Sequence, residues 1–391
     1  MSNPSPLDDS PAARRPEYGA AALDAFALVR ELLHLNHGSY GAVPKRVLAA
    51  QDSVGREIES DPTGFFQNRY PQRVREAAAV AARCFGGAAE DWVFCENATA
   101  AVNSVLASLP FRAGDEILTT SHAYGAVLKA MRLWAERRSA RTKVAEIPTV
   151  VESDAQVIEA VAKAFTAATR LLVIDHITSP TAAIFPAREI VEHAHNAGIP
   201  VLVDGAHVPG HLPLDVRQIG ADWYTGNAHK WLFAPRGCGL LWTAPKWQDI
   251  TRPAVLSHGT DAGYTAAFDW VGTRDVSPWL TLPEAVNAHA DFGGPALMSR
   301  NRALAAEAGT LLAARTGGTL TAPEAMRGAM ASICLPGSAT MDDATRLRHR
   351  LRDRGFVVWA NPFQSQLCLR ISVQIYSQLS DYERLADALR A

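Results

Sequence analysis

Short apolar runs alternate with helical stretches between about residues 90 and 245. The apolar residues of each run are consecutive, which is typical of strands buried on both faces of a parallel sheet. Helical patterns separate several of these runs. The pattern therefore predicts a doubly wound α/β domain. The candidate strands cover residues 92–95, 116–119, 143–147, 170–174, 200–203, 223–225 and 238–242, and the intervening helices cover 124–137, 154–165 and 187–196.

The segments before this region follow other patterns. Residues 23–33 are apolar at helical spacing, a turn-rich stretch follows at 36–41, and Pro44 is typical of the start of a helix. We expect residues 1–20 to form a flexible N-terminal arm. Residues 21–280 are expected to form the large α/β domain, with its N-terminal segment packing on a second, smaller domain.

An α+β pattern follows the α/β region. We expect a long, interrupted helix from Ser277 to about Arg315. Beyond it, short apolar strands alternate with helical patterns, which indicates a separate unit. Residues 281–391 are therefore expected to hold a linking helix and a smaller C-terminal α+β domain. The candidate strands here are 329–335, 356–360 and 366–373, and the candidate helices are 341–354 and 380–389.

Composition narrows the class of protein. The 391 residues exceed what one hydrophobic core usually supports, which favours two domains. With 38 basic and 40 acidic side chains the net charge is −2, which disfavours a dedicated binder of nucleic acid or of an anionic membrane. No apolar run reaches the roughly 18 residues that a membrane span needs, and the first residues lack the apolar core of a secretory signal. Five dispersed cysteines predict reduced thiols in a cytoplasmic protein.

Polar residues follow three of the predicted strands, and open α/β sheets bind ligands at the carboxyl ends of their strands. The segment Asn97-Ala98-Thr99 follows the first strand and begins a helix, whose N-terminus attracts anions. Asp204 ends the fifth strand, where a buried carboxylate needs a cationic partner. Lys230 follows the sixth strand among apolar aromatic residues, which would lower its pKa as an amine nucleophile requires. Each feature alone also fits a plain role, as a helix cap, a loop cap or a solvated lysine.

The order of these three features along the chain, a helix start at Asn97, a strand-end Asp204 and then Lys230, resembles that of pyridoxal-phosphate enzymes of fold type I. The motifs D-G-A-H at 204–207, N-A-H-K at 227–230 and W-V-G-T-R-D at 270–275 are similar to those of class V aminotransferases. The segments at 37–44 and 122–126 look most like isopenicillin N epimerase-like proteins. The resemblance extends from about Leu35 to Ser372. It implies a central, mostly parallel seven-stranded sheet flanked by helices, a smaller α+β C-terminal domain, and pyridoxal 5'-phosphate as cofactor.

The resemblance also implies roles for single residues. Lys230 matches the Schiff-base lysine, and Asp204 matches the carboxylate that keeps the pyridine nitrogen protonated. His207 matches a hydrogen-bond donor to the ring hydroxyl. His122 matches the residue that stacks on the cofactor, with Tyr124 as a competitor for that place. The remaining cofactor contacts implied are Asn97, Ala98, Thr99, Asn227 and His229 at the phosphate, and Ser179, where many class V enzymes carry Asn.

Two further inferences concern the substrate and a second subunit. Alternation along 367–373 puts Cys368, Arg370 and Ser372 on one strand face. Arginine suits bidentate carboxylate binding, and Arg370 matches the family's anchor for the substrate α-carboxylate, although a solvent-facing strand arginine is the plain alternative. The resemblance adds His37 and Arg274 as substrate-binding residues. Thr273 matches a phosphate ligand given by the neighbouring subunit, which implies a homodimer with shared active sites.

Several reactions remain open. The stretch 360–366 has no cysteine, which disfavours a cysteine desulfurase. An epimerase needs acid/base groups on both faces of a planar intermediate, and Lys230 together with His122, Tyr124 or Tyr264 would supply them. A C–S lyase performing β-elimination, or an aminotransferase, would use the same residues. We expect an isopenicillin N epimerase-like enzyme acting at Cα of an amino acid.

Other features are interpreted as structural. His193 and His195 lie two residues apart on a predicted helix, so they do not share a face, and no metal site is expected. The arginine-rich run at 346–354 follows two acidic residues, an order that suits a solvated helix face. Only about 35 residues precede the motif at Asn36, too few for the helix-turn-helix of a transcription regulator with a similar domain. We therefore expect neither nucleic acid nor membrane as a partner.

Overall fold

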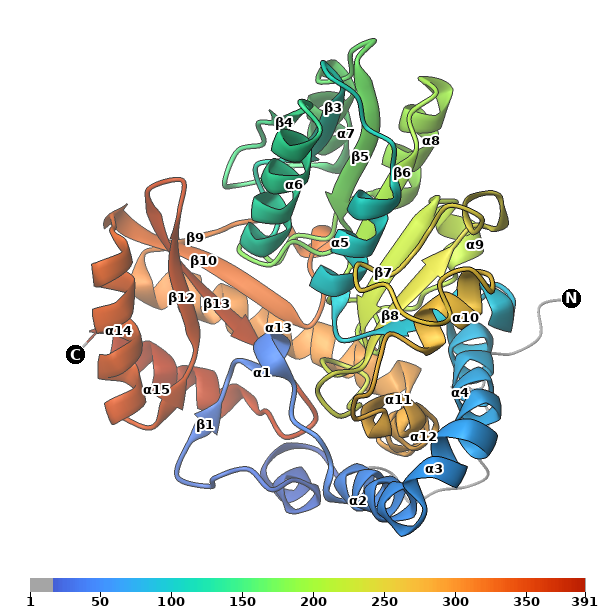
Figure 1. Cartoon of the computed structure of the whole chain (residues 1–391). Helices are drawn as coiled ribbons and strands as arrows, with labels where there is room; N and C mark the ends of the chain where they lie inside the picture. The colour runs from blue at the N-terminus through green and yellow to red at the C-terminus, as the bar shows by residue number, and fades with distance from the viewer. Residues whose placement is uncertain (1–16, 391) are drawn as a thin grey trace, which may run out of the picture.

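A computed structural model describes residues 17–390 of the chain, so most of the expected N-terminal arm lies outside the described residues. Its largest sheet has seven strands in the order β2-β8-β7-β6-β5-β3-β4 (Figure 1). β8 runs antiparallel to both of its neighbours, and the other adjacent pairs are parallel. All seven predicted strands and the mostly parallel sheet are confirmed. The strands are β2 Trp92–Cys95, β3 Glu116–Thr120, β4 Arg141–Ala145, β5 Thr169–Asp175, β6 Val201–Gly205, β7 Trp223–Asn227 and β8 Gly239–Thr243.

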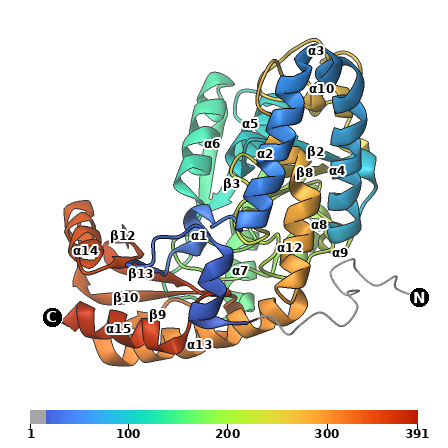
Figure 2. The same cartoon turned by 90° about the horizontal axis from the view of Figure 1, so that it is seen from below.

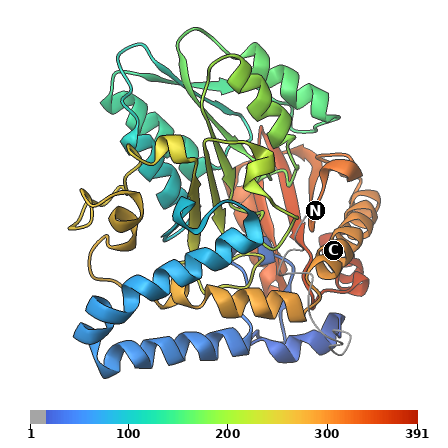
Figure 3. The ribbon, with the colours of Figure 1, turned by 90° about the vertical axis from the view of Figure 1, so that its right-hand side faces the viewer.

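Helices cover both faces of this sheet because its strands are apolar on consecutive residues. One face packs against α5, α6 and α10. The other packs against α2, α4, α7, α8, α9, α11 and α12, and Figure 3 shows orange α12 between blue α2 and light-blue α4. These helices are α2 Lys45–Ser60, α4 Tyr70–Phe85, α5 Ala98–Ser108, α6 Gly125–Arg137, α7 Asp154–Lys163, α8 Ala187–Asn196, α9 Val216–Ile219, α10 Tyr264–Asp269, α11 Ser277–Leu280 and α12 Leu282–Asp291, with the short α3 Pro62–Gly64 leading through a π turn into α4.

The helical spacing at 23–33 does not produce a helix of that length. A 3-10 helix covers Gly19–Ala25, and Phe26 then forms a β-bridge with Pro44. Further on, β1 (Leu33–His34) pairs in parallel with β11 (Phe356–Val357). The backbone groups of this stretch are therefore satisfied by other segments, which local spacing does not report. The short helix α1 (His37–Tyr40) then precedes α2, and Pro44 caps α2 as expected.

The C-terminal part forms the smaller domain. A four-stranded antiparallel sheet in the order β12-β13-β10-β9 packs one face on α13, α14 and α15. Figure 2 shows α13 alongside α15, turned steeply away from the end of α12, so that the two helices connect the two domains. The predicted long helix is thus interrupted, with a break at the two positive-φ glycines 293 and 294. The elements are α13 Pro295–Thr316, β9 Thr319–Leu320, β10 Met330–Ser338, α14 Met341–Asp353, β12 Trp359–Phe363, β13 Gln366–Ser372 and α15 Leu379–Arg390.

The second face of the small sheet is turned towards the large domain. Ser332 of β10 donates a hydrogen bond to the carbonyl of Pro180 (3.0 Å), and Thr321 donates one to the carbonyl of Thr181 (2.6 Å). This contact places β13 opposite the carboxyl ends of β5 and β6. Among the helices of residues 17–390, none combines the length and the apolar character needed to traverse a lipid bilayer.

Candidate active site

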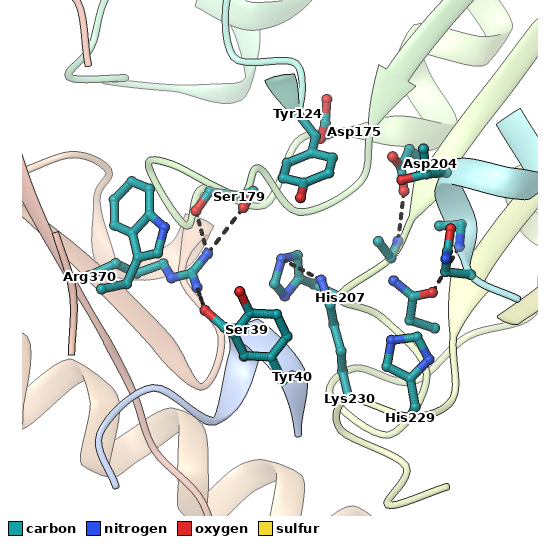
Figure 4. Close-up of a pocket in the computed structure, with 17 residues that line it drawn as sticks. Ser39, Tyr40, Tyr124, Asp175, Ser179, Asp204, His207, His229, Lys230 and Arg370 are labelled. Atoms are coloured by element: carbon teal, nitrogen blue, oxygen red, sulfur yellow. Dashed lines mark hydrogen bonds between the residues drawn. The ribbon is translucent and has the colours of Figure 1, made fainter. Parts of the chain in front are cut away.

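A cavity of about 480 Å³ lies where the carboxyl ends of the large-sheet strands meet the small domain. Figure 4 shows Arg370 and Ser179 at one end of it and Asp204 and His229 at the other, with His207 and Lys230 between them. Most of the residues proposed from the strand ends therefore share one cavity. Its lining includes Asn97, Ala98, Thr99, Tyr124, Ser179, Asp204, His207, Asn227, His229, Lys230 and Arg370, and also Gly38, Ser39, Tyr40, Asp175, Ala206 and Trp359.

Arg370 is a buried cation, with a side chain only 1% exposed. Its guanidinium donates hydrogen bonds to the carbonyl of Ser179 (2.6 Å) and to the hydroxyl of Ser39 (3.0 Å), and it stacks over Trp359. Its Nε–H has no hydrogen-bond partner, and no carboxylate within residues 17–390 forms an ion pair with it. Burial lowers the pKa of Arg370 to about 10, so it is still charged at neutral pH. A buried, unpaired guanidinium at a cavity wall is a site for an anion.

Lys230 projects its amine into the middle of the cavity. Its Nζ lies 3.1 Å from Nε2 of His207, and the indole N–H of Trp231 donates to Nδ1 of the same ring (3.4 Å). Because an indole nitrogen can only donate, the His207 proton must be on Nε2, which faces the lysine. The lysine nitrogen then accepts this hydrogen bond and is neutral. Burial, followed by the charge of Arg370, lowers the pKa of Lys230 to about 7, in agreement with this assignment.

Two carboxyl groups lie side by side at the floor of the cavity. Asp204 of β6 and Asp175 of β5 are register partners on adjacent parallel strands, and both are buried. Asp204 accepts a hydrogen bond from the backbone N–H of Ala206 (2.9 Å). Burial raises the pKa of Asp204, and burial together with the charge of Asp204 raises the pKa of Asp175 well above its ordinary value. The pair can therefore hold one negative charge, with Asp175 protonated, and a cation or an N–H donor beside Asp204 would stabilise it.

The N-terminus of α5 closes one end of the cavity. Asn97 caps this helix by accepting from the N–H of Ala100 (2.9 Å), and Asn227 of β7 accepts from the N–H of Ala98 (2.8 Å). The N–H of Thr99, between these two, makes no hydrogen bond within the described residues, and Thr99 lines the cavity. A helix start with a free N–H and a hydroxyl suits a phosphate group.

His122 lies outside the cavity lining, contrary to the stacking role that the resemblance implies. Its Nε2–H donates to the carbonyl of Pro148 (2.9 Å), and its Nδ1 accepts from the hydroxyl of Thr181 (2.7 Å). The ring is fully buried against Phe363, and burial lowers its pKa to about 4. Both ring nitrogens are therefore engaged. Tyr124, the other residue named for that place, does line the cavity, together with the aromatic residues Tyr40 and Trp359.

Tyr264 also lies away from the cavity. Its ring is 7% exposed in the core between the sheet and α5, and its hydroxyl lies 2.9 Å from that of Thr243. It cannot serve as the second acid/base group proposed from the sequence, because that role requires contact with the substrate.

Three other predicted residues, His37, Thr273 and Arg274, do not line the cavity. His37 is buried beneath it, where Nε2–H donates to the carbonyl of Lys230 (2.9 Å) and Nδ1 accepts from Tyr376 (2.9 Å). Arg274 pairs with Glu96 (2.6 Å), and Thr273 is exposed. His37 thus supports the lysine segment, whereas Arg274 is half-buried and stacks over the ring of Trp279.

Six residues of the lining had no role predicted from the sequence, and three of them, Asp175, Ser39 and Trp359, bear on the charged groups of the site. Asp175 directly follows the predicted strand 170–174, so the rule that found Asp204 would also have found it. Ser39 and Trp359 hold Arg370 from other parts of the chain, 331 and 11 residues away. Ser39 lies in the segment 37–44 that carries part of the resemblance, but its contact with Arg370 is not visible in the sequence. Within the described residues, no group of three or more His, Cys, Asp or Glu side chains is arranged to bind a metal ion.

Comparisons with known proteins agree with the geometry. The family model described as aminotransferase class-V matches residues 42–385. Isopenicillin N epimerase of Streptomyces clavuligerus is 34% identical over 379 residues, covering 92% of this chain and 94% of that protein. L-cysteine desulfhydrase of Arabidopsis thaliana is 29% identical over 394 residues, covering 91% and 86%. The structure of the cystine C–S lyase C-DES with its product cysteine persulfide superposes with a TM-score of 0.80 at 20% identity, covering 92% and 97% of the chains, a likeness of fold.

Proposed function

The chain belongs to the class V aminotransferase family, and from this premise we propose that it is a pyridoxal-phosphate enzyme that epimerises an amino acid at Cα. Family membership carries the cofactor and the coarse activity. The choice of reaction and the roles of single residues are our proposal. The observation that carries it is Arg370, a buried guanidinium without an acidic partner at the wall of a cavity that also holds Lys230.

The residues of the cavity fit the cofactor. Lys230 offers a neutral amine, Asp204 is a buried carboxylate that lacks a cation, and the N-terminus of α5 offers an unengaged N–H to a phosphate. His207 directs its Nε2–H towards the position that the lysine amine now occupies. When bound, pyridoxal phosphate would act as an electron sink that makes the α-proton of an amino acid acidic.

Arg370 would bind the α-carboxylate of the substrate. Its Nη atoms are fixed by Ser179 and Ser39, so the guanidinium is oriented before the substrate arrives. Bidentate binding by a fixed guanidinium sets the orientation of Cα relative to the lysine amine. Since no competing carboxylate pairs with Arg370 within residues 17–390, the substrate would supply the missing charge.

Lys230 would move the α-proton on one side of the cavity. With a pKa near 7, the amine can accept a proton and return it at neutral pH. In the view of Figure 4, the ring of Tyr124 lies above the Lys230 amine, and both residues line the cavity. We therefore propose Tyr124 as the group that delivers a proton from the other face, as inversion at Cα requires.

A second candidate is β-elimination by a C–S lyase. Of the three groups considered for the second face, His122 and Tyr264 do not line the cavity, which leaves Tyr124 alone. Elimination needs only the first proton abstraction and a leaving group at Cβ, so Lys230 would suffice. The likeness to L-cysteine desulfhydrase of Arabidopsis thaliana supports this alternative.

An assay in deuterated water separates the two reactions. The enzyme is incubated with a panel of L-amino acids, cysteine included, and the products are analysed by NMR and chiral chromatography. Deuterium at Cα with inverted configuration supports epimerisation, whereas release of a keto acid and ammonia, with hydrogen sulfide from cysteine, identifies elimination. Lys230→Ala should abolish both. Tyr124→Phe should abolish inversion while Cα proton exchange continues, and inversion at the wild-type rate in this variant contradicts the role of Tyr124.

We also propose that the enzyme is a cytoplasmic homodimer. The exposed Thr273 lies next to Arg274, whose partner Glu96 immediately precedes the Asn97 cap of the cavity helix. A neighbouring subunit docked at this side could therefore receive Thr273 at its phosphate end. Sedimentation of the purified protein tests the dimer, and a monomer that turns over substrate contradicts it.

A further inference from the structure

Two cysteines of the small domain face each other across neighbouring strands. Cys334 of β10 and Cys368 of β13 are register partners in the antiparallel pair, and their sulfur atoms are 3.2 Å apart. Both thiols are free in the structure. Cys334 is 4% exposed and Cys368 is fully buried, so Cys334 is the more accessible of the two.

The backbone geometry at this pair suits a covalent link. Near the end of the same ladder, the N–H of Val373 donates to the carbonyl of Ala329, which marks a hydrogen-bonded pair. Hydrogen-bonded and non-hydrogen-bonded pairs alternate along an antiparallel ladder, and counting from Ala329 makes Cys334 and Cys368 a non-hydrogen-bonded pair. In such pairs the Cα atoms are about 4.5 Å apart, at the short end of the range that disulfides span.

We propose that Cys334 and Cys368 form a reversible disulfide by exchange with a low-molecular-weight disulfide such as oxidised glutathione. The Cys334 thiolate attacks one sulfur of the small disulfide, and one small thiol leaves with the proton that Cys334 gave up. The Cys368 thiolate then attacks the mixed disulfide, and the second small thiol leaves with the proton from Cys368. Two cysteine thiols are oxidised and one small disulfide is reduced to two thiols, so atoms and electrons balance.

The order of attack follows from the local electrostatics. The hydrogen bond with the Cys368 thiol lowers the pKa of Cys334, whereas the same contact and burial raise the pKa of Cys368. Cys334 therefore carries the larger thiolate fraction and is the sulfur that reacts first. In the reverse direction a thiolate of reduced glutathione attacks the disulfide and the same two exchange steps restore both cysteine thiols, so the link is reversible.

The cysteine pair lies close to Arg370 in the sheet of the small domain. Cys368 shares its strand face with Arg370, and Ser332 opposite Arg370 is the next non-hydrogen-bonded pair along the ladder. The disulfide would thus lie one row from the buried guanidinium at the cavity. The remaining cysteines do not offer the same chemistry. Cys84 lies at the end of α4, and Cys95 and Cys238 belong to cores on opposite faces of the large sheet.

The test uses the full-length holoenzyme equilibrated with oxidised glutathione. Thiols counted after denaturation should fall from five to three, and a peptide map should show residues 334 and 368 joined with the loss of two hydrogens. Reduced glutathione in excess should restore five thiols without denaturant. Cys334→Ala and Cys368→Ala should give no joined peptide, whereas Cys84→Ala, a matched substitution at another buried cysteine, should form it as the wild type does.

Several results would overturn the proposal. A count that stays at five at equilibrium shows that the pair does not oxidise. A link between two chains, or a glutathione adduct that persists on Cys334, shows that the second exchange does not occur. A joined peptide that excess reduced glutathione leaves intact contradicts the reversible exchange proposed for the pair.

Discussion

At the scale of single residues, the site depends on charges that the fold leaves without protein partners. Arg370 is held by hydroxyl and carbonyl oxygens and by the ring of Trp359, and Asp204 accepts from a backbone N–H. A folded protein tolerates such groups only where a ligand offsets their cost of burial. The two charges lie at opposite ends of the cavity, which matches a zwitterionic substrate joined to a protonated ring.

The guanidinium geometry is tested by Arg370→Lys. A lysine keeps the positive charge but cannot form the forked pair of hydrogen bonds, each worth about 1.5–3 kcal/mol to a charged group. We expect KM for the amino acid to rise about 10- to 100-fold, with a smaller change in kcat. Steady-state kinetics measures this, with the exposed Arg350→Lys of α14 as control. An unchanged KM would exclude Arg370 as the carboxylate anchor.

The tautomer of His207 is tested by Trp231→Phe, which keeps an aromatic ring but removes the indole N–H. The His207 proton can then move to Nδ1, and Nε2 can accept from a lysine ammonium. We expect the pKa of Lys230 to rise above its value of about 7. The pH dependence of the rate at which the apoprotein takes up pyridoxal phosphate reports this shift.

A matched control is Trp223→Phe, which removes another buried indole N–H, one bonded to Thr251 far from the lysine. Its uptake profile should keep the wild-type midpoint. If both variants shift the midpoint equally, the effect arises from loosened packing and the tautomer argument fails.

At the scale of elements, the contact between the N-terminal segment and the lysine segment depends on a glycine. Gly41 follows α1 with φ of +69°, and a Cβ there would lie 2.1 Å from the carbonyl of His229. Gly41→Ala should therefore destabilise the fold by at least ~1–3 kcal/mol, since it adds backbone strain to a steric clash. Urea unfolding measures the change.

Gly55, in the neighbouring helix α2, has free space around it where Gly41 has a close contact. It lies in the interior of α2, and a Cβ there would meet nothing within 4 Å. Gly55→Ala should stabilise the protein by ~0.5–1 kcal/mol, because alanine loses less backbone entropy in a helix. If both glycine variants change stability in the same direction, the close approach at Gly41 is not the cause.

At the scale of the whole molecule, buried neutral histidines make stability depend on pH. Burial lowers the pKa of His37, His122, His176 and His289 to about 4 and that of His211 to about 3. The folded state therefore binds fewer protons than the unfolded state below pH 6.5, the ordinary histidine value. Stability is complete above pH 6.5 and is lost as the pH falls towards 4.

Each of these histidines should contribute up to ~1.4 kcal/mol per pH unit to the loss. Denaturant unfolding at several pH values between 7 and 4 measures the slope. His289→Asn, at a residue that does not line the cavity, should make the slope shallower by about one histidine's share, whereas the exposed His349→Asn should leave it unchanged. A slope that His289→Asn does not alter would contradict this account.

The sequence predicted the helices and strands better than the tertiary contacts between them. Consecutive apolar residues marked all seven strands of the large sheet, because a strand buried on both faces has that composition wherever it occurs. The rule that ligands bind at strand ends selected Asp204, Lys230 and Asn97, which line one cavity. The stretch at 23–33 misled because its backbone pairs with strands distant in sequence.

By itself, the sequence determined the class of fold, the absence of a charge bias and the identities of the chemical groups, because these depend on composition and on short-range periodicity. Only the tertiary structure decided which groups share the cavity. In the folded chain Ser39 accepts a hydrogen bond from Arg370, 331 residues away. Both nitrogens of His122 bond to groups outside the cavity lining, and Cys334 lies next to Cys368. Such contacts arise when whole elements dock, and docking depends on the summed packing of surfaces that no local pattern records.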